Sequence, residues 1–263
     1  AKAVLYIDDY NRVPYPGGFV LNSAIGSGEI VYPDNPNITY LLGPKYHLLR
    51  REFWEVPEKT INKEIRKILI TFGSTHKEGL ADKIIHSLKQ NKEYDFSIVG
   101  VDGNKLNAKQ MLKLILETDV CISAGGQTTY ELARVGVPTI GICFADNQRM
   151  SLEGWQKKGL IEYVGWYNDE NVIGKISESF DSIKSYSKRK NLSRAGKSCL
   201  DGKGAGRLTQ VIQEKALLQN REGKTLLRLR NATKDDCRDI WHWRNHPEVR
   251  KVCYEAEPLR YSE

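Results

Sequence analysis

The chain has 263 residues, 40% of them hydrophobic, so it is long enough to bury a full core in one large domain or two ordinary ones. It carries 40 Lys and Arg against 33 Asp and Glu, and this modest excess suits anionic ligands without indicating nucleic acid. No apolar run approaches the roughly 20 residues that span a bilayer, and the start of the sequence shows no signal-peptide pattern. We therefore expect a cytoplasmic protein that binds neither membrane nor nucleic acid.

The five cysteines are scattered and odd in number, and two lie in predicted buried strands, which favours free thiols over disulfides or a metal site. The Asp8-Asp9 pair, at the end of the first predicted strand, could supply metal ligands or catalytic carboxylates. Nothing else with metal-ligand spacing surrounds it, so we prefer a charged strand end that faces solvent. We expect neither a metal nor a cofactor.

The first 56 residues contain three short predicted strands, at 3–7, 19–22 and 39–42, separated by loops rich in glycine and proline. This part has little helix with which to cover a sheet, so residues 1–56 are interpreted as an incomplete domain. Residues 46–53 permit a helix, and we assign them to a linker between domains.

Residues 57–220 alternate strands and helices, which implies an α/β fold with a Rossmann-like parallel sheet. Strands are expected at 67–72, 96–99, 120–122, 139–144 and 161–164, and helices at 78–90, 105–117, 128–135, 152–158, 172–185 and 205–219. The section 184–207 holds eight Lys and Arg against one acid, Asp201. Such a run is either a solvated helix face or a surface that faces a diphosphate, and we expect the solvated face.

The most informative stretch runs from residue 119 to residue 148. A buried strand passes through a tight turn at Gly125-Gly126 into a helix that begins near Thr128. The turn therefore lies at the carboxyl end of a strand, where parallel α/β sheets bind ligands. Glycine lets a ligand approach the backbone, and the first turn of a helix attracts anions.

Further polar residues surround this turn. Glu131 lies one turn into the helix, where a carboxylate can accept hydrogen bonds from vicinal sugar hydroxyls, as acidic residues do for ribose. Asn147 and Gln148 follow the next strand and reach the same edge of the sheet. A glycine pair can also serve tight packing alone, but its combination with Thr128, Thr129 and Glu131 favours a nucleotide-sugar site.

Motifs spread over residues 1–215 resemble those of the pseudaminic-acid-pathway UDP-sugar hydrolases and their spore-coat-polysaccharide relatives, which are two-domain enzymes of GT-B type. The motifs lie at residues 7–10, 41–53, 71–74, 123–131, 136–138, 147–148 and 201–205. The resemblance implies a C-terminal GT-B half at 57–220, a remnant of the N-terminal GT-B domain at 1–56, and a last helix that packs back on that remnant. It also implies a UDP-sugar site at Gly73, Ser74, Gly125, Gly126, Thr128, Thr129, Glu131, Asn147 and Gln148.

The implied activity is hydrolysis of a UDP-diacetamido-trideoxy sugar, with release of UDP, in nonulosonic acid or surface-polysaccharide biosynthesis. The family's catalytic histidine belongs to a Gly-x-Gly-His turn that this sequence lacks, so we interpret the chain as N-terminally truncated, with its catalytic residues unknown. The family's Gly-Gly-Ser/Thr-Asp turn is altered here to Phe72, Gly73, Ser74 and Thr75, which weakens the assignment of this loop. His76 follows, either as a proton donor or phosphate contact or, in our preferred interpretation, as an exposed loop residue.

Residues 221–263 are predicted to form a strand at 226–230 and a helix at 233–244, capped by Thr233 and Asp236. They resemble the opening of a GNAT acetyltransferase without its acetyl-CoA loop. Their apolar side chains predict self-association, most simply as a homodimer. Two alternatives to hydrolysis stay open, a glycosyltransferase with a UDP-sugar donor and a non-catalytic nucleotide-sugar-binding module.

Overall fold

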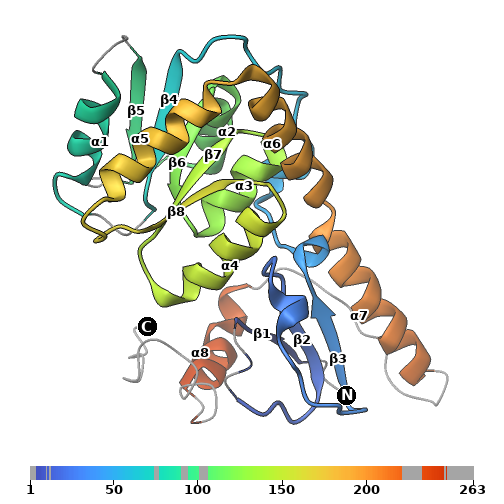
Figure 1. Ribbon diagram of the computed structural model, residues 1–263. Helices are drawn as coiled ribbons and strands as arrows, with labels where there is room; N and C mark the ends of the chain where they lie inside the picture. The colour runs from blue at the N-terminus through green and yellow to red at the C-terminus, as the bar shows by residue number, and fades with distance from the viewer. Residues whose placement is uncertain are drawn as a thin grey trace.

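The protein is an α/β structure with two parallel sheets (Figure 1). The computed structural model describes residues 4–9, 11, 13–73, 77–89, 94–100, 106–220, 233–245 and 247. The first sheet has three strands in sequence order, β1 (Leu5–Ile7), β2 (Gly18–Asn22) and β3 (Ile38–Leu42), as predicted. Within the described residues, no helix is both long enough and apolar enough to cross a membrane.

The second sheet has five strands in the order β5-β4-β6-β7-β8, all paired in parallel. Its strands are β4 (Lys67–Thr71), β5 (Asp95–Val99), β6 (Val120–Ala124), β7 (Thr139–Cys143) and β8 (Glu162–Trp166). The two central strands β6 and β7 are buried along their whole length, which explains their continuous apolar sequence. The carboxyl ends of β4, β6 and β7 therefore meet at one edge of the sheet.

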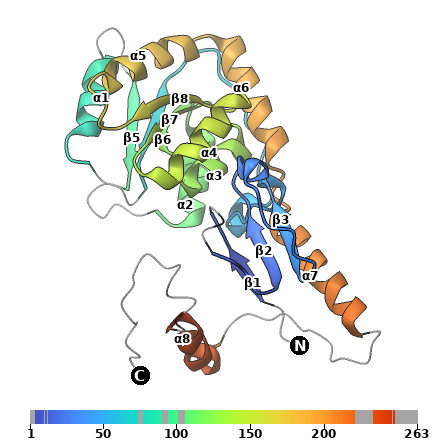
Figure 2. The ribbon, with the colours of Figure 1, turned by 60° about the horizontal axis from the view of Figure 1, so that its bottom comes forward.

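Helices cover both faces of this sheet. On one face lie α1 (Leu80–Leu88) and α5 (Val172–Ile183), and on the other lie α2 (Ala108–Glu117), α3 (Gln127–Val135) and α4 (Asp146–Lys157). Helix α6 (Tyr186–Cys199) runs against α3. Figure 2 shows the same layers from a second direction.

Helix α7 (Gly204–Asn220) leaves the second sheet and packs on the first, as the resemblance implied. Its Leu208 joins Phe19, Leu21 and Leu41 in a small buried cluster. Figures 1 and 2 both show α7 alongside β3. The three-stranded sheet is thus covered by a helix that follows all the strands of the second sheet in the sequence.

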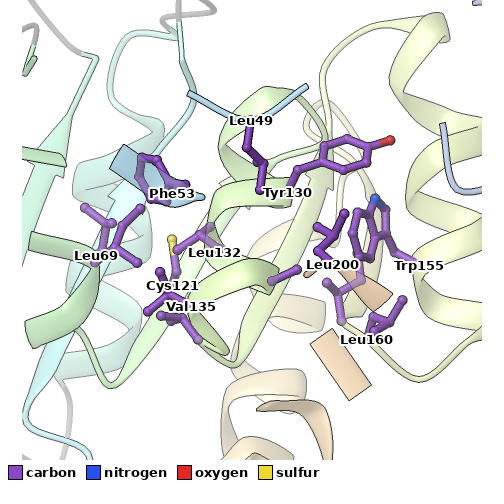
Figure 3. Packing of buried hydrophobic residues seen from close by; sticks show 14 of the residues in the cluster. Leu49, Phe53, Leu69, Cys121, Tyr130, Leu132, Val135, Trp155, Leu160 and Leu200 are labelled. Carbon is purple, nitrogen blue, oxygen red and sulfur yellow. The ribbon is translucent and has the colours of Figure 1, made fainter. Parts of the chain in front are cut away.

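The segment before β4 is not a free linker. It contains two short 3₁₀ turns, Pro44–Tyr46 and Arg51–Phe53, instead of the helix that its composition permits. Leu49 and Phe53 are buried in the same cluster as Leu132 of α3 and Trp155 of α4 (Figure 3). We call residues 47–54 the strap, because they lie across α3.

The strap also packs against the residues at and just before the start of α7. A Cβ atom on Gly202 would lie 2.3 Å from the carbonyl oxygen of Trp54, and one on Gly204 would lie 2.1 Å from that of His47. Real Cβ atoms do not come so close to backbone oxygen, so any side chain at these two glycines would push the strap away. The strap is therefore packed between α3 and the start of α7.

Two expectations need correction. Helix α4 begins at Asp146 and not near residue 152, so Asn147 and Gln148 form its first turn instead of a loop. In the basic section, Arg189 is neither solvated nor open to a ligand, because it is 1% exposed and donates to four backbone carbonyls. Those carbonyls belong to Asn62, Lys63, Ile183 and Lys184.

In the C-terminal segment, Thr233 and Asp236 form the predicted capping box, followed by a 3₁₀ turn (Lys234–Asp236) and α8 (Cys237–Asn245). The strand expected at 226–230 lies outside the described residues. The likeness of this segment to acetyltransferases and the expected dimer stay predictions.

Candidate functional site

The predicted glycine turns lie next to each other. Strands β4 and β6 are neighbours, with Thr71 paired to Ser123, so Gly73 follows one strand end and Gly125-Gly126 the adjacent one. Ser74 and His76 lie outside the described residues. The carboxyl edge of the sheet therefore places both described turns where one ligand could contact them.

The two glycines after β6 have different surroundings. A Cβ on Gly125 would lie 2.7 Å from Cγ of Leu152 on α4, so this glycine is needed for packing. A Cβ on Gly126 would meet nothing within 4 Å, and the φ of Gly126, −92°, is open to any residue. Tight packing thus explains Gly125, and only Gly126 faces open space that a ligand could enter.

No side chain at the N-cap of α3 accepts from the N–H groups of its first turn, although the N–H of Thr129 donates to the carbonyl of Gly126. Gly126 is the N-cap residue and provides no side-chain cap hydrogen bond. Thr129 is buried, and its hydroxyl donates to the carbonyl of Ala124 at 2.7 Å, so it stabilises the turn from inside. Thr128 is half-buried. A helix end with these features can bind an anion through its N–H groups and its dipole.

Glu131 does not lie open at the site. It is 1% exposed, and its two carboxylate oxygens accept from Nε and Nη2 of Arg50 at 2.6 and 2.7 Å. The hydrogen bond to Glu131 is the main cause that raises the pKa of Arg50. A ribose that reached this carboxylate would therefore have to displace Arg50, whose side chain is 40% exposed.

Arg50 is one of several strap groups that contact a single face of α3. That face is formed by Gln127, Tyr130, Glu131 and Arg134, at the spacing of three and four residues that aligns helix side chains. Arg134 donates to the carbonyls of Phe53 and Trp54 in the strap. The sequence motif at 41–53 marks the strap, but nothing in it shows which helix the strap contacts.

His47 is the second strap residue that sequence reasoning missed. Its ring stacks on Tyr130 with centroids 3.5 Å apart and an interplanar angle of 4°. Its Nδ1 lies 2.9 Å from Oγ of Ser23, and its Nε2 lies 3.0 Å from Oε1 of Gln127. Burial lowers the pKa of His47 to about 4, so the ring is neutral near pH 7.

The polar residues after β7 line the same edge. Asn147 is half-buried in the first turn of α4. Gln148 accepts a hydrogen bond from the backbone N–H of Phe144 at 2.9 Å, which holds the start of α4 against the end of β7. Gln148 is therefore already engaged within the chain.

Asp8 is another correction, because it is 7% exposed and does not face solvent. Its carboxylate accepts from the hydroxyls of Tyr15 at 2.7 Å and Tyr32 at 2.5 Å, and from the backbone N–H of Asn11 at 2.8 Å. Burial, followed by the bond to Asp8, raises the pKa of Tyr32 above its usual range. Asp9 is exposed, as expected for a strand end.

The chain matches no protein-family model. Over its whole length it is 25% identical to an uncharacterized protein of Methanocaldococcus jannaschii, of which it spans 57%. It is also 25% identical to the spore coat polysaccharide biosynthesis protein SpsG of Bacillus subtilis, over 81% of this chain and 70% of that protein.

A third relative is the pseudaminic acid cytidylyltransferase and UDP-2,4-diacetamido-2,4,6-trideoxy-beta-L-altropyranose hydrolase of Helicobacter pylori. The identity is 24% over 73% of this chain, which covers 38% of that protein. Among solved structures, the glycotransferase of kitacinnamycin superposes with a TM-score of 0.51 at 15% identity, over 76% of this chain and 55% of that one. The fold is thus α/β of the GT-B glycosyltransferase type.

Proposed function

We propose that this chain carries the UDP-sugar-binding half of a hydrolase that releases UDP from a diacetamido-trideoxy sugar, in nonulosonic acid or surface-polysaccharide biosynthesis. The observation that carries the proposal is the open turn at Gly126, at the start of α3 and beside the ends of β4 and β7. The names of the Bacillus and Helicobacter relatives, which concern polysaccharide and UDP-sugar chemistry, support it.

The diphosphate binds at the first turn of α3. Its oxygens accept from the backbone N–H groups near Gly126 and Thr128, and the helix dipole adds to the attraction. Gly73 presents its backbone from the neighbouring turn, and Asn147 adds a side-chain amide from the start of α4. The hydroxyl of Thr129 and the amide oxygen of Gln148 are engaged within the chain, so these two residues shape the site, and the amide nitrogen of Gln148 can still donate to the ligand.

The ribose binds at Glu131 in exchange for Arg50. Arg50 donates two N–H groups to the two carboxylate oxygens. The two hydroxyls of a vicinal diol can donate to the same two oxygens. The exposed side of Arg50 gives it room to swing away while Glu131 stays in place. The carboxylate therefore has a hydrogen-bonding partner with or without the nucleotide.

The reaction is the attack of water on the anomeric carbon, with cleavage of the bond between that carbon and the β-phosphate oxygen. UDP leaves with increased charge on its β-phosphate, and N–H groups aimed at that position stabilise the charge. The groups that move the proton of the water are not assigned to residues of this chain.

The same site could hold a UDP-sugar donor for transfer to an acceptor, or bind it without chemistry. Incubation of the protein with a UDP-sugar in the absence of acceptor separates these functions. Free sugar appears only in the case of hydrolysis, because a glycosyltransferase needs its acceptor and a binding module leaves the UDP-sugar intact.

Calorimetry with UDP tests the binding site itself. We expect the wild-type protein to bind UDP, and Gly126→Ala to weaken binding by about 1.5–3 kcal/mol, the range for a lost hydrogen bond to a charged group. The methyl group has room in the free protein, and because alanine is less favourable than glycine at an N-cap we expect a loss of stability of only about 0.5–1 kcal/mol. Gly206→Ala in α7, where an added Cβ also meets nothing within 4 Å, is the matched control. Absence of UDP binding, or equal affinity of Gly126→Ala and the control, would refute the site.

A further inference from the structure

The first turn of α3 lacks the residue that usually holds a helix start in place. Ser, Thr, Asp or Asn at the N-cap would accept from the N–H groups of the first turn and so fix its geometry. Gly126 occupies this position and offers no such bond. A capping side chain would also consume the donors that an anion needs, so the turn must be held by other contacts.

Thr129 supplies one of those contacts from inside the turn, and the strap supplies others through Gln127. The side-chain Nε2 of Gln127 donates to the carbonyl of Leu48 at 3.2 Å, so its Oε1 is the atom that faces His47. An amide oxygen only accepts, and therefore His47 carries its proton on Nε2 and donates to Gln127. The remaining nitrogen, Nδ1, is then an acceptor, and the hydroxyl of Ser23 donates to it.

We call this chain of hydrogen bonds from Ser23 through His47 to Gln127 and Leu48 the relay. It runs from Ser23, just after β2 of the three-stranded sheet, through His47 to Gln127 in the first turn of α3 and back to the strap at Leu48. The parallel stacking on Tyr130 sets the plane of the imidazole, and the ring is 8% exposed. Every polar atom of the His47 ring and of the Gln127 amide thus has a partner inside the chain.

We propose that His47 is a positioning residue, which aligns the anion-binding turn of α3 by holding Gln127 and leaves the backbone N–H groups of that turn to the ligand. It takes the place of an N-cap side chain, but it acts from the strap. The proposal rests on the proposed function, because it assumes that phosphate binds at this turn. Because His47 aligns the turn that binds the phosphates, its loss should weaken binding of the phosphates and leave binding of the nucleoside unchanged.

The test compares UDP with uridine, which lacks the phosphates. His47→Phe keeps an aromatic ring against Tyr130 and removes both hydrogen bonds, and we expect UDP affinity to fall about tenfold, the effect of roughly one hydrogen bond. Uridine affinity should stay unchanged. His47→Gln restores an N–H near the Nε2 position and should recover part of the loss. His86→Phe, at an exposed histidine on α1, is the matched control.

Gln127→Leu tests the other end of the relay. Because Gln127 is exposed, this substitution does not alter the buried core. It should show the same selective loss for UDP, which keeps the test decisive if His47→Phe does not fold. Equal UDP affinity of wild type and both variants, or parallel losses for UDP and uridine, would overturn the role of His47 while UDP binding stands. A wild-type protein that binds no UDP would refute the proposed function, and this inference with it.

Discussion

The carboxyl edges of the two sheets each contain a buried acid, and the two acids are held in different ways. Asp8, after β1, accepts from two tyrosine hydroxyls and a backbone N–H that lie close to it in the sequence. Glu131, in the first turns of α3, is held by the guanidinium of Arg50. Both carboxylates are almost inaccessible to solvent, at 7% and 1% exposure.

The difference lies in where the partners come from. These donors to Asp8 belong to Asn11, Tyr15 and Tyr32, which lie within the next 24 residues of the chain. Arg50 is 81 positions from Glu131 and reaches it only because the strap packs on α3. Donors that lie close in the sequence belong to the sheet itself, whereas a partner that comes from a distant segment can be exchanged for a ligand.

The largest effect is expected for Arg50→Met, which leaves the carboxylate of Glu131 buried without a counter-charge. We expect the free energy of unfolding to fall by about 3–4 kcal/mol, toward the lower end of the range for a broken buried pair because Arg50 is partly exposed. Urea titration measures the change. The double variant Arg50→Met with Glu131→Leu should recover most of the loss.

The control for this variant is Lys157→Met, which breaks the ion pair with Glu29, where both side chains are about 70% exposed in solvent. Ion pairs between exposed side chains contribute little to stability, because solvent and salt screen them. If Arg50→Met cost no more than this control, the Glu131 pair would behave as a surface contact and the contrast with Asp8 would disappear.

His47 joins the two edges, and its titration gives the next largest effect. The pKa of His47 is about 4 in the folded protein against 6.5 as the reference value, so between these pH values only the unfolded chain gains the proton. Stability should therefore fall as pH drops from 6.5 to 4, by about 2–3 kcal/mol. The free energy of unfolding of His47→Phe lacks this contribution. The difference in stability between wild type and this variant should therefore narrow as the pH falls from 6.5 to 4. Parallel pH profiles of the two proteins would contradict the assigned burial.

The smallest effect concerns Asp8. Tyr32→Phe removes one hydroxyl donor to Asp8 and also leaves the side-chain amide of Asn22 without the Tyr32 hydroxyl. We expect a loss of about 1–2 kcal/mol, since the hydroxyl of Tyr15 and the backbone N–H of Asn11 still donate to Asp8. Tyr40→Phe is the matched control, because its ring lies beside that of Tyr32 and its hydroxyl bonds only the exposed carbonyl of Pro33. Equal losses in both variants would show that the hydroxyl of Tyr32 adds nothing specific.

The sequence was sufficient for the strands and most helices, because periodic apolar residues and glycine turns are local signals. Helix α7 was expected at 205–219 and spans Gly204–Asn220, and the Thr233 cap is where it was predicted. Contacts over long distances were not predictable. The pairing of Glu131 with Arg50 and the stacking of His47 on Tyr130 follow only once the strap is packed on α3.

The same limit explains the errors at the site. The pattern Gly125-Gly126 does not show that Leu152 fills the space above the first glycine and leaves the second open. Asp8 looked like a solvent-facing acid because its partners Tyr15 and Tyr32 lie in loops without a periodic pattern. In the basic section, the sequence does not show that Arg189 is buried, because its neighbours are other Lys and Arg residues of the same charge.

The close packing of the strap between Gly204 and α3 also affects how fast a nucleotide could enter. With Leu49 and Phe53 buried and the backbone of His47 in contact with Gly204, the strap itself has no room to lift. Exchange at Glu131 then requires that Arg50 release its two hydrogen bonds and rotate its side chain, a local change that moves no backbone. Loop or domain closure is slower, on the order of microseconds to milliseconds. Diffusion of the ligand, and not the opening of a lid, would then set the association rate.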